Sequence, residues 1–145
     1  MNDDKKLEVG QVLWLKLKFD NKQEYSSIKH PYLIIEIDKH IRLVNLLQFD
    51  SLAGKEYNIL MKENYFVSCD EPEETVIYKD SYIQLNRIIH VQLCEELKQY
   101  RKTTDKLSRG KLELIAKKYS DYIVSNDIAD SRISTYSKED ILANN

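Results

Sequence analysis

The sequence has few of the residues that build disulfide frameworks, metal centres and nucleotide-binding loops. Its 145 residues include two cysteines, two prolines and three glycines. Cys69 and Cys94 do not form a CxxC motif and have no histidine cluster beside them, so we expect neither a zinc site nor a disulfide framework. Three glycines are too few for a glycine-rich loop that cradles a phosphate. We therefore expect no metal ion and no cofactor.

The sequence also lacks an excess of either charge and any long apolar run. It has 22 basic and 24 acidic side chains, for a formal net charge of −2. Non-specific binding to duplex nucleic acid usually needs a basic excess, although a local basic groove remains compatible with this balance. No apolar run approaches the roughly 20 residues that cross a bilayer, and residues 1–9 are charged, unlike a signal peptide. We expect a soluble, cytoplasmic protein without a membrane partner.

Residues 10–92 show the period-two alternation of β-strands. In residues 10–19, leucines alternate with polar residues that include Lys16 and Lys18. Two strongly apolar strands follow at residues 31–38 and 41–49, and the short turn between them predicts an antiparallel hairpin. Further short strands are predicted at residues 56–62, 65–69, 75–78, 82–85 and 88–92.

After residue 92 the apolar spacing becomes helical. It predicts a helix over residues 93–101 and a second over 106–124, which residues 103–105 cap. The leucine, isoleucine and tyrosine side chains of the second helix line one face, with lysines opposite. From residue 125 the chain is polar, so we expect it to fray, with one helical turn starting at residues 137–140.

Short strands followed by helices indicate a mainly β (α+β) fold, here a small SH3-like antiparallel β-barrel with C-terminal helices. No predicted helix lies between the strands, which argues against a parallel α/β fold. We predict a single domain over residues 1–126, with its C-terminal helices at 93–124, and a polar tail at 127–145.

Four segments occur in a distinctive order. Gly-Gln-Val-Leu-Trp-Leu at residues 10–15 precedes a polar loop, and His-Pro-Tyr-Leu-Ile-Ile follows at 30–35. Gln-Phe-Asp-Ser then occupies residues 48–51, and Asp-Ser-Tyr-Ile-Gln-Leu-Asn occupies 80–86. This order resembles the MazF/PemK family of toxin endoribonucleases. That family has Gly-Asp-Val-Val-Trp-Val, Arg-Pro before an apolar strand, Pro-Ile-Thr-Ser, and Asp-Gln-Val-Arg-Ser-Leu-Asp at these places. The resemblance covers about residues 10–100.

The resemblance implies an endoribonuclease that cleaves single-stranded RNA, without a metal ion, through attack of the 2′-OH on phosphorus. It also implies a homodimer and a cognate antitoxin, either protein or RNA, within a toxin–antitoxin or phage-defence system. His30 stands at the place of the family's catalytic arginine. The family's threonine falls on Phe49 or Asp50, depending on where a gap is placed, with Ser51 adjacent.

The candidate catalytic residues are therefore His30, Asp50 and Ser51. A histidine can transfer protons near neutral pH, Asp50 can orient it or accept a proton, and Ser51 can donate to a phosphate oxygen. The candidate RNA-binding residues are the lysines of the first strand, the lysine beside His30 and the stretch that lines the family's RNA groove: Lys16, Lys18, Lys29, Gln84, Asn86 and Arg87.

Other interpretations stay open at this point. A non-catalytic SH3-like module that binds RNA or a protein partner is favoured by the histidine in place of the family's arginine, since a fold does not establish a function. Residues 50–51 can simply form a turn, and strand lysines are commonly solvated. A gyrase-poisoning toxin on the same barrel is a third possibility, of which the polar tail gives no sign.

Overall fold

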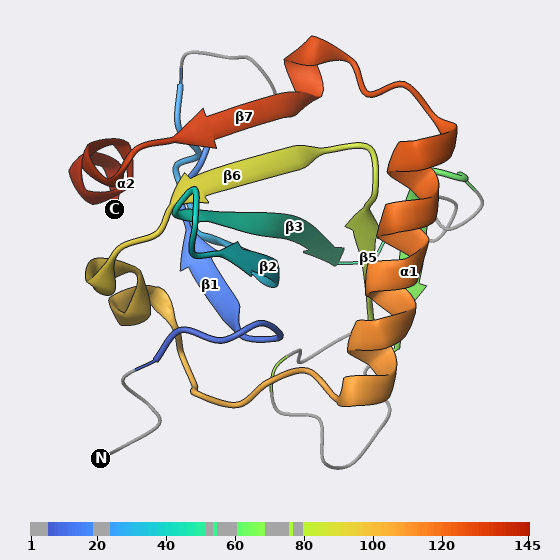
Figure 1. The fold of residues 1–145 in the computed structure, drawn as a ribbon, viewed down its shortest axis with the longest axis horizontal. Helices are drawn as coiled ribbons and strands as arrows, with labels where there is room; N and C mark the ends of the chain where they lie inside the picture. Colours follow the sequence, from blue (N-terminus) through green and yellow to red (C-terminus); the bar gives the residue numbers. More distant parts are fainter. Residues whose placement is uncertain (1–5, 19–23, 52–53, 55–60, 69–75, 77–79) are drawn as a thin grey trace.

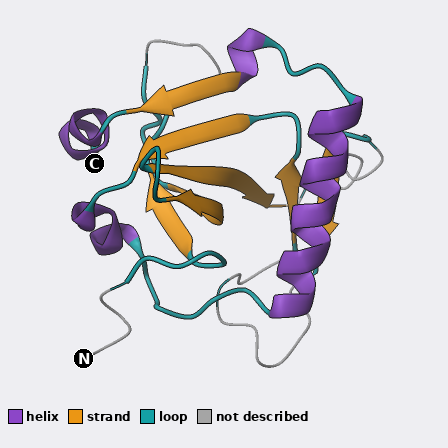
Figure 2. Ribbon diagram, in the orientation of Figure 1, coloured by secondary structure: helices purple, strands orange, loops and turns teal. Residues whose placement is uncertain are grey.

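The computed structural model describes residues 6–18, 24–51, 54, 61–68, 76 and 80–145. In this part of the chain the fold is mainly β, with seven strands in one largely antiparallel sheet and a few helices (Figures 1 and 2). The strands are β1 (Val12–Leu15), β2 (His30–Asp38), β3 (Leu43–Ser51), β4 (Asn64–Val67), β5 (Ser81–Gln84), β6 (Ile88–Gln92) and β7 (Ile133–Tyr136). The helices are the 3₁₀ helices η3 (Glu95–Tyr100) and η4 (Asp130–Arg132) and the α-helices α1 (Arg109–Ser125) and α2 (Lys138–Asn144).

The sheet is organised around β3. One edge of β3 pairs with β2, whereas the other edge pairs with β6 over its first half and with β5 over its second half. A register irregularity between Ile34 and Glu36 lets β2 bend. Among the described strands, β1, β4 and β7 each pair with a single neighbour, so these strands form an open sheet. The predicted mainly β fold is confirmed at this level.

Two apolar clusters pack on the opposite faces of the sheet. The first lies against β1, β2, β3 and β6, and Leu97 of η3, Tyr136 of β7 and Ile141 of α2 complete it. The second lies between the other face and α1, which contributes Ile115 and Tyr119. Figure 1 shows α1 running beside β5 on one side of the molecule and α2 on the opposite side. Helices α1 and α2 thus belong to the clusters on opposite faces of the sheet.

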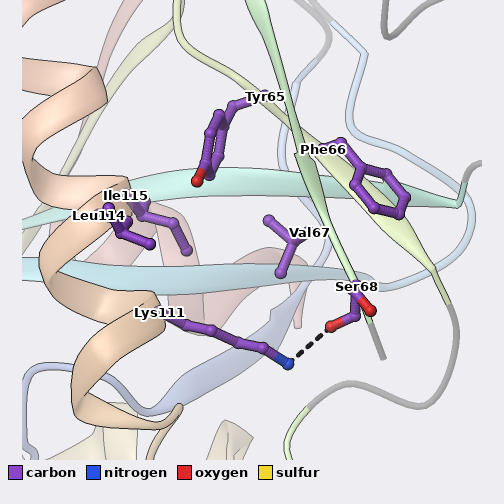
Figure 3. Close-up of a pocket in the computed structure, with 7 residues that line it drawn as sticks. All are labelled: Tyr65, Phe66, Val67, Ser68, Lys111, Leu114 and Ile115. Carbon is purple, nitrogen blue, oxygen red and sulfur yellow. Dashed lines mark hydrogen bonds between the residues drawn. The ribbon is translucent and has the colours of Figure 1, made fainter. Parts of the chain in front are cut away.

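Helix α1 packs directly against β4. Figure 3 shows Ile115 and Leu114 facing the β4 strand across a small pocket. At its edge, Lys111 Nζ donates a hydrogen bond of 2.7 Å to the carbonyl of Ser68, which follows β4. The helix begins at Arg109, later than predicted, because the Ser108 hydroxyl caps it in place of residues 103–105.

The hairpin turn between β2 and β3 is longer than predicted. Asp38 Oδ1 accepts hydrogen bonds from the backbone N–H groups of His40 (2.9 Å) and Ile41 (3.2 Å). These bonds keep Ile41 in the turn, where it is 65% exposed, so the strand begins at Leu43. At its other end, β3 continues through Ser51 where the sequence favoured a turn, because β5 supplies a pairing partner.

The polar C-terminal segment does not fray, contrary to the prediction. β7 adds to β6 in parallel, and α2 begins with a capping box between Ser137 and Asp140, so the predicted helical turn is present. Two apolar anchors, Tyr136 and Ile141, are buried in the first core. They are too few to make a periodic stripe, which is why the sequence pattern missed them.

Some predictions fall outside the described residues. Of the strand predicted at residues 56–62, only Met61 and Lys62 are described, and they belong to a turn. Of the strand predicted at residues 75–78, only Val76 is described. Within the described part of the chain, no helix is both long enough and apolar enough to cross a membrane.

Candidate functional site

Asp50 lies near the end of β3, on the face that continues the first core. It stands opposite Tyr82 in the pairing of β3 with β5. Gln48 lies two residues earlier on the same face, and its Nε2 donates to Asp50 Oδ1 at 3.2 Å. Gln84 on β5 donates through Nε2 to Asp50 Oδ2. Two amide donors thus fix the orientation of a half-buried carboxylate that still has lone pairs for a further donor.

Arg87 brings a buried positive charge to this group. It lies between β5 and β6, and the residue is 2% exposed. Its Nη1 donates to Gln48 Oε1, and its Nη2 donates to the backbone carbonyl of Lys18. Both of these acceptors are neutral. The nearest carboxylate in the same series of hydrogen bonds is Asp50, which Gln48 links to Arg87. A buried guanidinium needs such partners, because an uncompensated buried charge costs several kcal/mol.

Arg132 of η4 extends the group from the C-terminal segment. Its Nη2 donates to Gln84 Oε1 at 2.7 Å and to Asn86 Oδ1 at 3.0 Å. Gln84 therefore binds Asp50 through its amide nitrogen and Arg132 through its amide oxygen. The hydrogen bonds form one continuous series, the Asp50 network: Arg87, Gln48, Asp50, Gln84, Arg132 and Asn86.

A shallow pocket gives this network access to solvent. Gln84, Asn86 and Arg132 line it together with Tyr82, Met61, Glu63 and Asn64. Asp50 is not part of this lining, but it accepts a hydrogen bond from Gln84, which is. The pocket presents amide groups, a guanidinium and a carboxylate, so a polar ligand can be hydrogen-bonded there and an anionic group can bind at Arg132.

His30 begins β2 and is half-buried. It pairs with Leu15 of β1 and lies on the same face as Tyr32, whose partner on β3 is Gln48. The pairing of β2 with β3 ends at Tyr32 opposite Gln48, and His30 and Asp50 each lie two residues beyond this pair. Both residues therefore lie at the same end of these two neighbouring strands. Burial raises the pKa of the Tyr32 phenol above its ordinary value of 10, against an opposing effect of Arg87, so this phenol stays neutral at physiological pH.

Ser51 lies next to Asp50 in sequence but on the other face of β3. It pairs with Ser81 on β5, and the strand alternation turns its side chain to the face opposite Asp50. That Ser51 donates to a phosphate oxygen stays a prediction, with its side chain on the other face of the strand from Asp50. Because Asp50 and Ser51 are adjacent in sequence, a turn could have brought both side chains to one site. In the continuing strand β3, adjacent side chains instead point to opposite faces.

The predicted lysines take different positions. Lys16 and Lys18 follow β1, where Asn145 hydrogen-bonds the backbone of Lys16 and Arg87 the carbonyl of Lys18. The Lys18 ammonium lies 5.4 Å from the centre of the Tyr25 ring. The Lys29 ammonium lies 5.1 Å from the centre of the Tyr100 ring. Only Lys18 therefore touches the Asp50 network, and it does so through its backbone.

Gln48 and Arg132 are two members of the Asp50 network that were not predicted from the sequence. Gln48 carried a signal, because polar residues at positions 48 and 50 interrupt the apolar face of an otherwise buried strand. No pattern in the sequence indicated Arg132, because its position depends on the parallel pairing of β7 with β6. Among the described residues, no group of three or more histidine, cysteine, aspartate or glutamate side chains could hold a metal ion.

Comparison of the sequence with models of protein families gives no match. Comparison with curated proteins likewise gives none. The resemblance in segment order therefore rests on the residues given above, and the function is argued from the Asp50 network and the residues around it.

Proposed function

We propose that this protein is an endoribonuclease that cleaves single-stranded RNA without a metal ion. The Asp50 network carries this proposal. It joins four residues that the sequence resemblance had assigned to a ribonuclease site from two separate segments: Asp50, Gln84, Asn86 and Arg87. His30 lies at the same end of the neighbouring strand β2, two residues beyond Tyr32, which pairs with Gln48.

The reaction forms a bond between the 2′-oxygen and phosphorus and breaks the bond from phosphorus to the 5′-oxygen. The 2′-OH must lose a proton, and the leaving 5′-oxygen must gain one. In this proposal His30 and Asp50 perform these two transfers, and Arg132 stabilises the negative charge that develops on the phosphate. Arg87 is buried and reaches Asp50 only through Gln48, so it is a positioning residue.

The wider assignment follows the MazF/PemK resemblance. The bent sheet around the first core supports an SH3-like barrel. On this assignment the protein acts in the cytoplasm as a homodimer, and a cognate antitoxin of protein or RNA restrains it within a toxin–antitoxin or phage-defence system.

The test is incubation of the purified full chain with single-stranded RNA in EDTA. We expect cleavage products with a 5′-hydroxyl group. His30→Ala should lower the rate by a factor of about 100 or more, because a proton-transfer group is lost. Lys118→Ala removes an exposed charge from α1 and should leave the rate unchanged. RNA that stays intact at high protein concentration, in several sequence contexts, contradicts the proposal.

One observation favours a second candidate, a non-catalytic RNA-binding module. Both carboxylate oxygens of Asp50 already accept hydrogen bonds from Gln48 and Gln84, and the residue is not among those that line the pocket. If the network is purely structural, the protein binds RNA through Arg132 and the pocket without cutting it. The assay above separates the two candidates when RNA binding is measured in parallel.

A further inference from the structure

A second pocket lies at the other end of β3, about 25 Å along the strand from Asp50. Three segments that are distant in sequence form it: the N-terminal residues 6–7, the turn between β2 and β3, and residues 93–98 with η3. Four cationic side chains line this turn pocket, against one acidic side chain, Glu95: Lys6, Lys39, Arg42 and Lys98. Only Lys98 pairs with Glu95 within this lining, so the pocket carries a clear positive excess.

The floor of the turn pocket is apolar. Leu7, Ile37 and Leu93 line it, and each is a partly buried residue that packs against the first core. Burial raises the pKa of the Cys94 thiol, also in the lining, so the thiol is neutral at physiological pH and does not offset the cations. A cationic rim over an apolar floor suits a ligand that combines an anionic group with a flat, weakly polar body.

Local structure holds the rim in place. The Arg101 guanidinium donates a 2.9 Å hydrogen bond to the carbonyl of Lys6. The backbone N–H of Leu93 donates to the carbonyl of Arg42, also at 2.9 Å. The cationic segments are thus fixed to the body of the protein, so little ordering of their backbone is needed when a ligand binds.

Arg42 has the left-handed backbone conformation that favours glycine. Its φ is 58°, and it is the one non-glycine residue with a positive φ among those described. A side chain at such a position costs free energy that glycine would avoid. The guanidinium makes only a long hydrogen bond of 3.5 Å to the carbonyl of Leu93, which does not offset this cost. Backbone strain of this kind clusters at ligand-binding positions, which makes Arg42 a candidate to contact a ligand.

We propose that the turn pocket binds a phosphate group of single-stranded RNA, with a neighbouring base against the apolar floor. This inference rests on the proposed function for its ligand class. The chain as a whole carries a net charge of −2, so affinity for RNA depends on local clusters of cations. Arginine and lysine are the side chains that most often contact nucleic-acid phosphates. The pocket thereby anchors RNA at a distance from the bond that the Asp50 network cleaves.

The experiment measures the affinity of the full chain for a fluorescently labelled single-stranded RNA over a range of salt concentrations. All proteins carry His30→Ala, so that the RNA remains intact during the measurement. Arg42→Gly is the main variant, because glycine suits the local backbone. Lys39→Ala is a second pocket variant, and Lys118→Ala on α1 is the control of equal charge.

We expect each pocket variant to lower the affinity several-fold at low salt. Each should also reduce the slope of log K against log salt by about 0.7, the value for one lost phosphate contact on a single strand. The control should leave the slope unchanged. Pocket variants with the affinity and slope of the parent overturn the proposal. The same proteins are also titrated with adenosine monophosphate. If the pocket variants lose binding of this nucleotide but keep RNA binding, the pocket binds a free nucleotide and the proposal is overturned.

The two proposals fail in different ways. If the protein without the His30 substitution binds RNA but never cleaves it, the ribonuclease proposal falls, and Arg42→Gly must still weaken binding for the turn pocket to stand. If that protein cleaves RNA and Arg42→Gly has no effect on affinity or slope, the turn pocket falls and the ribonuclease proposal stands.

Discussion

The two ends of β3 carry charge in contrasting ways. Around Asp50, charges of both signs are buried or half-buried and are joined by side-chain hydrogen bonds. Around the turn, mostly exposed cations with a single acidic side chain surround a pocket. Buried polar groups are costly to disturb, whereas exposed charges contribute little to stability. Effects on stability and on ligand binding should therefore differ between the two ends: variants at the Asp50 end lower both, whereas variants at the turn lower binding and change stability only slightly.

The largest effect on stability is expected for Arg87→Met. Methionine fills similar space but leaves Gln48 Oε1 and the carbonyl of Lys18 without their donor. We expect the free energy of unfolding to fall by about 3 kcal/mol. Urea denaturation measures this fall, with Arg42→Met at the opposite end of β3 as the matched control. Equal stabilities for these two variants would break the comparison.

A smaller loss is expected for Tyr136→Phe, which tests how the C-terminal segment supports the Asp50 end. The Tyr136 hydroxyl accepts a 3.1 Å hydrogen bond from the backbone N–H of Lys18, whose carbonyl in turn accepts from Arg87. Removing the hydroxyl should lower the free energy of unfolding by about 1 kcal/mol. Thermal unfolding of the variant measures the loss. A melting temperature equal to that of the parent protein shows that β7 gives this end no support.

Arg42→Gly should change stability in the opposite direction. Glycine relieves the left-handed strain at φ 58° but increases the conformational entropy of the unfolded chain. The balance predicts a gain of about 0.5 kcal/mol in the free energy of unfolding. Denaturation in parallel with Arg42→Ala, which keeps a side chain at the strained position, isolates the backbone effect. If glycine is less stable than alanine, Arg42 is not strained.

The smallest effect is a pH dependence in the C-terminal segment. The hydrogen bond from the Ser137 backbone N–H lowers the pKa of Asp140 below its ordinary value of 3.8. A lowered carboxyl pKa contributes stability above 3.8 that is lost as the pH falls through the lower, folded-state value. The carboxylate is exposed, so we expect a loss of only about 0.3 kcal/mol. In Asp140→Asn this contribution should be absent, and an unchanged acid dependence in that variant excludes the capping box as its source.

The strand pattern could be predicted from the sequence because it depends on local alternation. β2 was expected at residues 31–38 and spans His30–Asp38, and β6 was expected and found at residues 88–92. The C-terminal segment could not be predicted, since β7 has little apolar pattern of its own and gains its stability by pairing with β6. Where tertiary pairing supplies the stability, periodicity in sequence gives no signal.

The candidate site could be predicted in part for the same reason. The resemblance selected Asp50 and Gln84, which do come together, because strand order determines which segments are neighbours. Arg132 lies in a polar stretch that looks like any solvated loop. Ser51 lies in a strand where the sequence favoured a turn, so its side chain is on the other face from Asp50. Sequence order thus predicts which segments meet, but not which side chains share a face at the ends of strands.

The most direct test of the central claim is the rate at which Asp50→Asn cleaves single-stranded RNA in EDTA. Asparagine has nearly the same shape and can keep one amide contact, so the free energy of unfolding should change by only about 1 kcal/mol. The account predicts a cleavage rate at least about 100-fold below that of the parent protein, with 5′-hydroxyl products from the parent. An Asp50→Asn variant that cleaves RNA as fast as the parent contradicts the account.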